Sequence, residues 1–225
     1  MKSKLLFISL FFSFLIGGLE QAQAQCANQG TLPTEDFDCD GISNENDLDS
    51  DNDGILDVYE CSFLNYEFYN SVPPNGSNGN PTVDNIPTSG ADATGVVSEI
   101  DVDAIYADNT TNGNGFEYAI RYTGHIYINK AGDYTFYTNS DDGSKLFIDG
   151  NEIVDNDGLH PEIEESGTIT GLTEGLHSLE ILYFQSYGFT ALDVSYESTG
   201  QNIAKQNIMN IVSANETDCN SFDTD

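Results

Sequence analysis

The chain has 225 residues, of which 38% are hydrophobic and 21 are glycine, a composition typical of globular proteins. It carries 38 acidic and 6 basic side chains, which gives a formal net charge of −32. Nucleic acids and anionic membranes are bound through basic surface, so this composition argues against both and favours cationic partners, metal ions first.

Residues 1–24 have the pattern of a signal peptide. Two lysines precede the apolar run 5–16, and Ala22 and Ala24 form a small-x-small cleavage site. The apolar run is shorter than the about 20 residues that a membrane-spanning helix needs. We therefore expect a protein that is secreted or held at the cell surface, with no membrane insertion after the signal is removed.

Residues 25–62 are acidic, poor in apolar side chains, and contain a repeated pattern. One copy starts at Asp36, and the second starts thirteen residues later at Asp49. Each copy has oxygen-bearing side chains at alternate positions, then a glycine, then a closing acid, which is the ligand spacing of a calcium-binding loop. The expected calcium ligands are Asp36, Asp38, Asp40, Asn44, Asp47, Asp49, Asp51, Asp53, Asp57 and Glu60.

The thirteen-residue period leaves no room for helices between the two loops, so the calcium ions must take the place of a hydrophobic core. On the residues from Asp36 to Glu60 the segment resembles type-3 thrombospondin repeats. This resemblance implies a stalk-like module that folds on binding calcium. The alternative is a solvated acidic linker.

The four cysteines, Cys26, Cys39, Cys61 and Cys219, all follow the expected signal peptide. An even number of cysteines in an exported chain predicts two disulfides, and the spacing does not choose among the three possible pairings. Zinc binding is less favoured, because the sequence has no C-x-x-C pair and no neighbouring pair of histidines.

Residues 63–198 hold most of the aromatic and β-branched side chains. Apolar and polar residues alternate along 116–128, which predicts a half-buried strand or strand pair, and Asp149-Gly150-Asn151 is a hairpin turn signal. No amphipathic helix pattern precedes residue 199. The region therefore predicts an all-β fold, an antiparallel β-sandwich or barrel. Further short strands are expected at 134–138, 145–148, 152–154, 177–184 and 190–196.

Two segments are less clearly patterned. Residues 71–95 hold four prolines among Asn, Gly and Ser, which predicts a long loop or a linker. The tail 199–225 contains apolar residues that fit either a strand or a short helix. Its acidic end looks like the start of another repeat, which leaves open that the sequence is part of a longer protein.

Three segments, Leu64–Asn70, Tyr134–Gly150 and Gly175–Phe184, carry a second resemblance. On these residues the region 63–198 resembles the protective-antigen (PA-14) domain. The resemblance implies a β-sandwich of the kind used in adhesins, toxins, yeast flocculins and the accessory regions of glycosidases.

Some PA-14 domains are calcium-dependent lectins, in which two adjacent Asp residues joined by a cis peptide bond hold calcium, and calcium holds sugar hydroxyls. Asp141 and Asp142 match this pair, and residues 185–188 match the second binding loop. The resemblance therefore implies calcium at Asp141 and Asp142 and a ligand site that adds Gln185, Tyr187 and Gly188, with Tyr187 stacking on the sugar. The alternative is that the Asp-Asp-Gly turn only shapes a hairpin.

We expect no catalysis by this chain. Adjacent carboxylates are too close to act as a glycosidase pair, whose carboxyl groups lie about 5–9 Å apart. No Ser or Cys nucleophile motif accompanies His125, His160 or His177.

The expected function is adhesion or carbohydrate recognition by a secreted calcium-binding protein, with extracellular glycans or cell-surface polysaccharide as partner. The alternatives are a structural spacer or docking module that binds no sugar, and an accessory region of a larger glycosidase.

Overall fold

The computed structural model describes residues 62–70, 80–110 and 117–213. The chain divides into two compact units, 1–53 and 54–225, and all described residues belong to the second. The expected signal peptide, the calcium ligands of the acidic repeats and the four cysteines lie outside the described residues. In the described part, no helix has the length and apolar character needed to cross a membrane.

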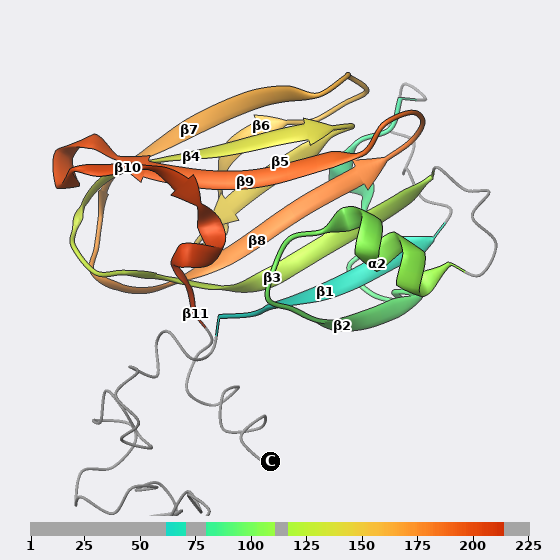
Figure 1. Cartoon of the computed structure of the whole chain (residues 1–225), viewed down its shortest axis with the longest axis horizontal. Coiled ribbons are helices and arrows are strands. Elements are labelled where there is room, and N and C mark those ends of the chain that lie inside the picture. The colour runs from blue at the N-terminus through green and yellow to red at the C-terminus, as the bar shows by residue number, and fades with distance from the viewer. Residues whose placement is uncertain (1–61, 71–79, 111–116, 214–225) are drawn as a thin grey trace, which may run out of the picture. The chain divides into compact units, whose positions relative to one another are not determined.

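The domain is a sandwich of two antiparallel sheets (Figure 1), as the alternating pattern predicts. The larger sheet has the strand order β2-β1-β3-β8-β5-β6, with β11 also paired to β3, and the smaller sheet has the order β10-β9-β4-β7. The strands are β1 (Leu64–Asn70), β2 (Ala93–Val97), β3 (Tyr118–Ile128), β4 (Gly132–Asp141), β5 (Ser144–Ile148), β6 (Asn151–Asn156), β7 (Ile163–Leu172), β8 (Gly175–Gln185), β9 (Ala191–Ser198), β10 (Ile203–Asn207) and β11 (Val212–Ser213).

The long central strands β3 and β8 organise the larger sheet. They pair continuously from Tyr118 opposite Gln185 to Ile128 opposite Gly175. The alternate residues of β3 that were expected to face the core are buried, among them Ile120, Tyr122 and Ile126. Period-2 patterning is thus confirmed where one face of a strand packs on the core and the other does not.

The hairpin turn predicted between β5 and β6 is confirmed. Asp149 and Gly150 both have positive φ, at 50° and 73°. Two-residue hairpin turns of this kind need such backbone angles, which Asp tolerates and Gly adopts without steric cost.

The expectation of no helix is wrong at one place, because Val102–Asn109 form the helix α2. Asp101 caps this helix, since its side chain accepts a hydrogen bond of 2.9 Å from the backbone N–H of Ala104. The helix buries only Val102 and Ile105. Two buried positions in eight residues leave no visible helical periodicity in the sequence.

The segment 71–95, expected to be a loop or linker, contains two ordered parts among its described residues. Residues 80–92 lie on the outer face of the larger sheet, where Val83 and Ile86 pack against side chains such as Leu182 and Phe184. Strand β2 then begins at Ala93, inside the segment for which no strand was expected.

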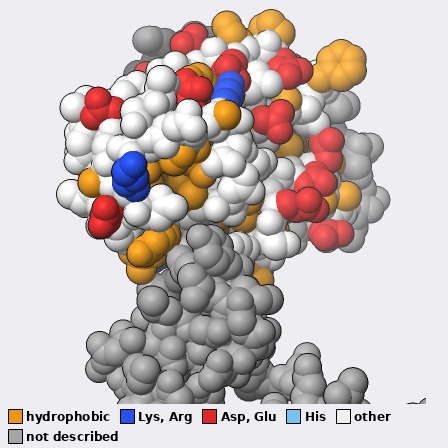
Figure 2. Space-filling view, turned by 60° about the vertical axis from the view of Figure 1, so that its left-hand side comes forward, with side chains coloured by type: hydrophobic (Ala, Val, Ile, Leu, Met, Phe, Trp, Pro, Cys, Tyr) orange, Lys and Arg blue, Asp and Glu red, His pale blue; other side chains and the backbone are white. Residues whose placement is uncertain are grey.

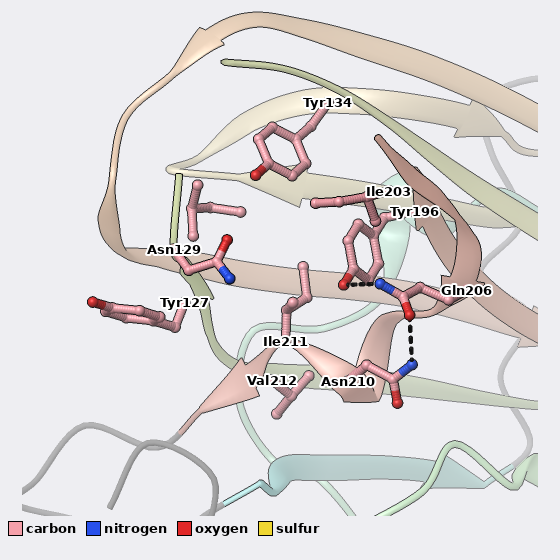
Figure 3. A pocket seen from close by; sticks show the side chains of 10 residues that line it. Tyr127, Asn129, Tyr134, Tyr196, Ile203, Gln206, Asn210, Ile211 and Val212 are labelled. Atoms are coloured by element: carbon pink, nitrogen blue, oxygen red, sulfur yellow. Dashed lines mark hydrogen bonds between the residues drawn. The ribbon is translucent and has the colours of Figure 1, made fainter. Parts of the chain in front are cut away.

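The residues after Ser198 form both kinds of structure that the sequence left open. They make the short 3₁₀ helix η3 (Thr199–Gln201), then β10, the 3₁₀ helix η4 (Ile208–Asn210) and β11. They close one end of the sandwich around a cavity of about 190 Å³, where the Gln206 amide bonds to the Tyr196 hydroxyl and to Asn210 (Figure 3). Figure 2 brings this end forward and shows hydrophobic side chains gathered near the middle, with acidic side chains around them.

Candidate functional site

Asp141 and Asp142 lie where β4 turns into β5, at the end of the sandwich to which β4 and β8 point in Figure 1. The peptide bond between them is cis. Both residues are nearly buried, with 8% and 5% of their surface exposed. The sequence resemblance thus corresponds to a pair of adjacent, shielded carboxyl groups.

Asp142 is held by three segments of the chain. One carboxylate oxygen accepts a hydrogen bond of 2.8 Å from the backbone N–H of Ser186, and the other accepts one of 3.3 Å from the backbone N–H of His160. The backbone N–H of Asp142 donates to the side-chain oxygen of Gln185 at 3.0 Å. The β4–β5 turn, the β6–β7 loop and the β8–β9 loop therefore meet at this residue.

The buried Gln185 side chain connects Asp142 to the β8–β9 loop. It is fully buried, and its amide nitrogen donates to the backbone oxygen of Phe189 at 2.9 Å. The hydroxyl of Tyr183 donates to the Gln185 side-chain oxygen at 3.1 Å and lies 2.7 Å from the backbone oxygen of Asp141. With both ends of its amide occupied, the Gln185 side chain positions Asp142 and the β8–β9 loop.

Asp157 fixes the β6–β7 loop, a role that the sequence did not reveal. Its carboxylate accepts hydrogen bonds from the backbone N–H groups of Gly158, at 2.8 Å, and Val83, at 3.0 Å, and from the Thr82 hydroxyl. A side chain at Gly143 would approach the Gly158 nitrogen to 2.7 Å, so this close contact requires glycine. The loop 80–92 thereby supports the site from outside.

The imidazole of His160 also holds the loop. Its two ring nitrogens lie 2.9 Å and 3.0 Å from the backbone oxygens of Asn156 and Pro161. A carbonyl oxygen only accepts, so the ring nitrogen that carries a hydrogen donates to its neighbouring carbonyl, which assigns the ring a structural part in shaping the turn.

The acid pair is electrostatically unbalanced. Burial, and then the neighbouring charge of Asp142, raise the pKa of Asp141 above its ordinary value, although a hydrogen bond from the backbone N–H of Glu162 acts in the opposite direction. Among the described residues, no Lys or Arg forms an ion pair with either carboxylate. A cation from solution would supply the missing positive charge.

Two aromatic side chains project from the β8–β9 loop beside the pair. Tyr187 is 70% exposed, and its hydroxyl donates to Glu117 at 2.9 Å. Phe189 is 87% exposed, and Gly188 between them has a φ of 108°. The sequence singled out Tyr187 and Gly188 but missed Phe189, although an aromatic residue two positions further along the same loop was a usable signal.

The donors at this site fit a hard cation such as calcium, which binds carboxylate, carbonyl and water oxygens. Within 62–70, 80–110 and 117–213, no group of three or more His, Cys, Asp or Glu side chains is arranged so that it could hold a metal ion by itself. Two carboxylates supply only part of the six to eight oxygens that calcium takes, so backbone oxygens, water or ligand hydroxyls would complete the shell.

The fold and sequence have recognisable relatives. Among solved structures, the PA14 domain of the MpAFP antifreeze protein has a TM-score of 0.56 and 19% identity, over 68% of this chain and 91% of that chain. The PA14 sugar-binding domain from an RTX adhesin has a TM-score of 0.55 and 22% identity, over 69% of this chain and 99% of that chain.

At these identities the likeness to solved structures concerns the fold. No sequence among the curated proteins matches the chain. The PA14 domain family matches residues 72–209, which is more than half of the sequence. By this match the chain belongs to the PA14 domain family.

Proposed function

We propose that this domain recognises carbohydrate through a calcium ion held by Asp141 and Asp142, as part of an exported adhesion protein. The observation that carries the proposal is the buried acid pair, which has no ion-pair partner among the described residues. Calcium supplies the counter-charge, and its remaining coordination positions take pairs of sugar hydroxyls.

The residues around the pair have distinct parts in this proposal. The backbone N–H groups of Ser186 and His160 orient the Asp142 carboxylate before any metal binds. Tyr187 and Phe189 offer exposed aromatic surface, against which the C–H face of a sugar ring packs. Gly188, with no side chain, leaves the backbone between them open to a ligand.

The position of the pair in the domain supports a role in adhesion. The described chain begins and ends side by side, because the Ser62 hydroxyl donates to the backbone oxygen of Val212 at 3.0 Å. Ser213 pairs with His125, seven residues along β3 from Tyr118, which pairs with Gln185 at the site. At about 3.3 Å per residue the two places are about 23 Å apart, so the site lies at the other end of β3 from the residues where the described chain begins and ends.

The same proposal covers the rest of the chain. A signal peptide at 1–24 directs export, residues 25–62 form calcium-binding repeats, the sandwich follows from residue 63, and 199–225 are the tail. The PA14 sugar-binding domain of an RTX adhesin, which shares the fold, supports the adhesive and non-catalytic role. The surplus of acidic side chains is consistent with an extracellular chain that depends on calcium.

A glycan array tests the proposal. The full chain should bind one class of glycan in calcium and lose that binding in EGTA, and Asp142→Asn should lose it even in calcium. Asp193→Asn, the same change at an exposed position of β9, is the control and should bind like the wild type. Glycan binding that survives both EGTA and Asp142→Asn would overturn the metal-dependent mechanism.

One observation favours a second candidate, a structural module without a sugar site. Both oxygens of Asp142 already accept backbone hydrogen bonds, which is sufficient for a carboxylate that only shapes a turn. In that case the full chain binds no glycan in calcium, and calcium changes only the stability of the acidic repeats.

A further inference from the structure

A second hollow lies on the outer face of the larger sheet, away from the acid pair. It has a volume of about 350 Å³ and crosses β1, β3 and β8, with β11 and the β5–β6 turn at its borders. Its lining includes six polar side chains, Asn65, Thr123, His125, Ser178, Glu180 and Ser213. We call this hollow the sheet groove.

The strand register arranges these side chains as a grid. Asn65, Thr123 and Glu180 lie directly opposite one another on three neighbouring strands. His125 and Ser178 form the next row, two residues further along the strands. Neighbouring strands are about 4.8 Å apart and rows about 7 Å apart, so hydrogen-bonding groups recur at regular intervals across the groove.

The two sides of the groove are fixed by contacts within the chain. On one side the guanidinium of Arg121 lies 3.4 Å from Glu180 and 3.8 Å from Glu67. On the other side Asp149 bonds to both backbone groups of Ser178 at 3.0 Å and so holds the β5–β6 turn against β8. The groove is therefore formed before any ligand enters.

We propose that the sheet groove is a second binding site, which takes a neutral oligosaccharide and needs no metal. Hydroxyl, amide, imidazole and carboxylate groups together can both donate to and accept from sugar hydroxyls. Phe63, at one border, adds a partly buried aromatic ring.

Two other ligand classes fit the groove less well. A polyanion would meet a chain of net charge −32, and Glu180 is the charged side chain of the lining. An extended peptide binds a sheet by pairing with an edge strand, whereas β1, β3 and β8 each have a strand on both sides.

The sheet groove and the calcium site are far enough apart that two different parts of one polysaccharide can bind to them at the same time. Thr123 is five residues along β3 from Tyr118, or about 17 Å, so one sugar unit cannot occupy both. A polysaccharide that reaches both sites binds with the gain of a linked second contact.

The test uses the full-length Asp142→Asn variant in EGTA, in which the calcium-dependent site is disabled. Cellohexaose, xylohexaose, maltohexaose and mannohexaose are titrated in turn, and the amide NMR signals of Thr123, His125 and Ser178 are followed. We expect at least one oligosaccharide to shift these signals. Because this background lacks Asp142, the sheet groove and the calcium site can fail independently.

A pair of added substitutions then locates the binding. Thr123→Val with Ser178→Ala removes two hydroxyls and should weaken binding roughly tenfold. Thr94→Val, the same change in β2 outside the groove, should leave it unchanged. The proposal is overturned if none of the four oligosaccharides shifts the signals, or if the double substitution binds as tightly as its parent.

Discussion

Lys145, on β5, and the acid pair Asp141 and Asp142, at the turn between β4 and β5, are buried close together in the sequence, but only the lysine has partners of opposite charge. The Lys145 side chain is 8% exposed, and its ammonium lies 2.9 Å from Asp84, 3.0 Å from Glu152 and 3.9 Å from Asp155. Asp141 and Asp142 are equally buried, but no Lys or Arg of the described chain pairs with them.

The pKa shifts express this contrast. Burial by itself lowers the pKa of Lys145, but hydrogen bonds to Asp84 and Glu152 outweigh it, and the pKa is raised. Burial and the neighbouring carboxylate both raise the pKa of Asp141. The lysine is therefore stabilised in its charged form by the chain itself, whereas the acid pair needs a positive charge from outside.

The largest effect is expected from Asp142→Asn. The change removes one negative charge and one oxygen, and the new NH₂ group faces a backbone N–H of Ser186 or His160. Calcium-dependent glycan binding should fall at least about 100-fold, which corresponds to about 2.7 kcal/mol. Calorimetry on the full chain should count one calcium fewer than in the wild type.

The acidic repeats provide the matched control. Asp53→Asn changes an expected ligand of the repeats and should reduce calcium binding there without changing glycan binding. An unchanged calcium count in Asp142→Asn would mean that the acid pair does not hold the ion.

Lys145→Met should have the next largest effect, and here the lost charge is a positive one that the chain itself neutralises. It removes a buried ammonium and leaves three carboxylates facing one another, so we expect a loss of about 2–3 kcal/mol in the free energy of unfolding. The value lies below that for a fully buried pair because the three carboxylates are about half exposed. Urea denaturation at pH 7 measures it.

The control for this change is Lys205→Met. Lys205 is more exposed. In the described part of the chain its ammonium forms an ion pair with one carboxylate, that of Glu164, and lies 3.9 Å from the centre of the Tyr137 ring, so its replacement should cost less than about 1 kcal/mol. Equal losses at both lysines would contradict a special role for the ion cluster around Lys145.

The effect of Asp141→Asn on stability should change sign when calcium is added. Because the folded state raises the pKa of Asp141, ionisation of this group destabilises the metal-free protein as the pH rises above the ordinary value of 3.8. An uncharged amide avoids this, so the metal-free variant should be about 1 kcal/mol more stable than the wild type at pH 7.

In saturating calcium the same variant should be the less stable of the two, because it binds the ion more weakly. Thermal unfolding of both proteins, with calcium and with EGTA, gives the four values needed. A variant that is destabilised equally in both conditions would show that Asp141 has only a structural role.

The fold was predictable wherever one pattern dominated the local sequence. The alternation along β3 and the Asp-Gly turn of the β5–β6 hairpin each follow from side-chain periodicity or turn chemistry. The helix α2 and the edge strand β7 were missed, because α2 buries two residues and β7 is exposed along most of its length. A helix or strand that buries few side chains shows little hydrophobic periodicity in the sequence.

The sequence motif predicted which residues form the site, but it did not predict the contacts that hold them in place. The family motif marks Asp141 and Asp142, but it gives no sign that Gln185 is buried beneath them or that Asp157 connects the supporting loop to Thr82. Such contacts join segments more than forty residues apart, and single-sequence patterns do not encode them.

The smallest effect concerns Asp149, which holds the β5–β6 turn beside the sheet groove. Burial by itself raises the pKa of Asp149, but hydrogen bonds from His177, at 2.7 Å, and from the Ser178 backbone outweigh it, and the pKa is lowered. The contact therefore stabilises the fold above the ordinary value of 3.8, and this contribution is lost as the pH falls through the lowered pKa. Asp149→Asn should cost less than about 1 kcal/mol at pH 6–7, because the side chain is about half exposed.

The difference between Asp149→Asn and the wild type should shrink as the pH falls below 3.8 and through the lowered pKa of Asp149, because the wild-type carboxyl then takes up its proton. Asn tolerates the positive φ of position 149, so the turn is preserved and the change tests the charge alone. Asp193→Asn, at an exposed site on β9, should show no such pH dependence. A difference that does not shrink as the pH is lowered would assign the effect to turn geometry, and the pairing of His177 with a charged Asp149 would then contribute nothing to the rigidity of the groove.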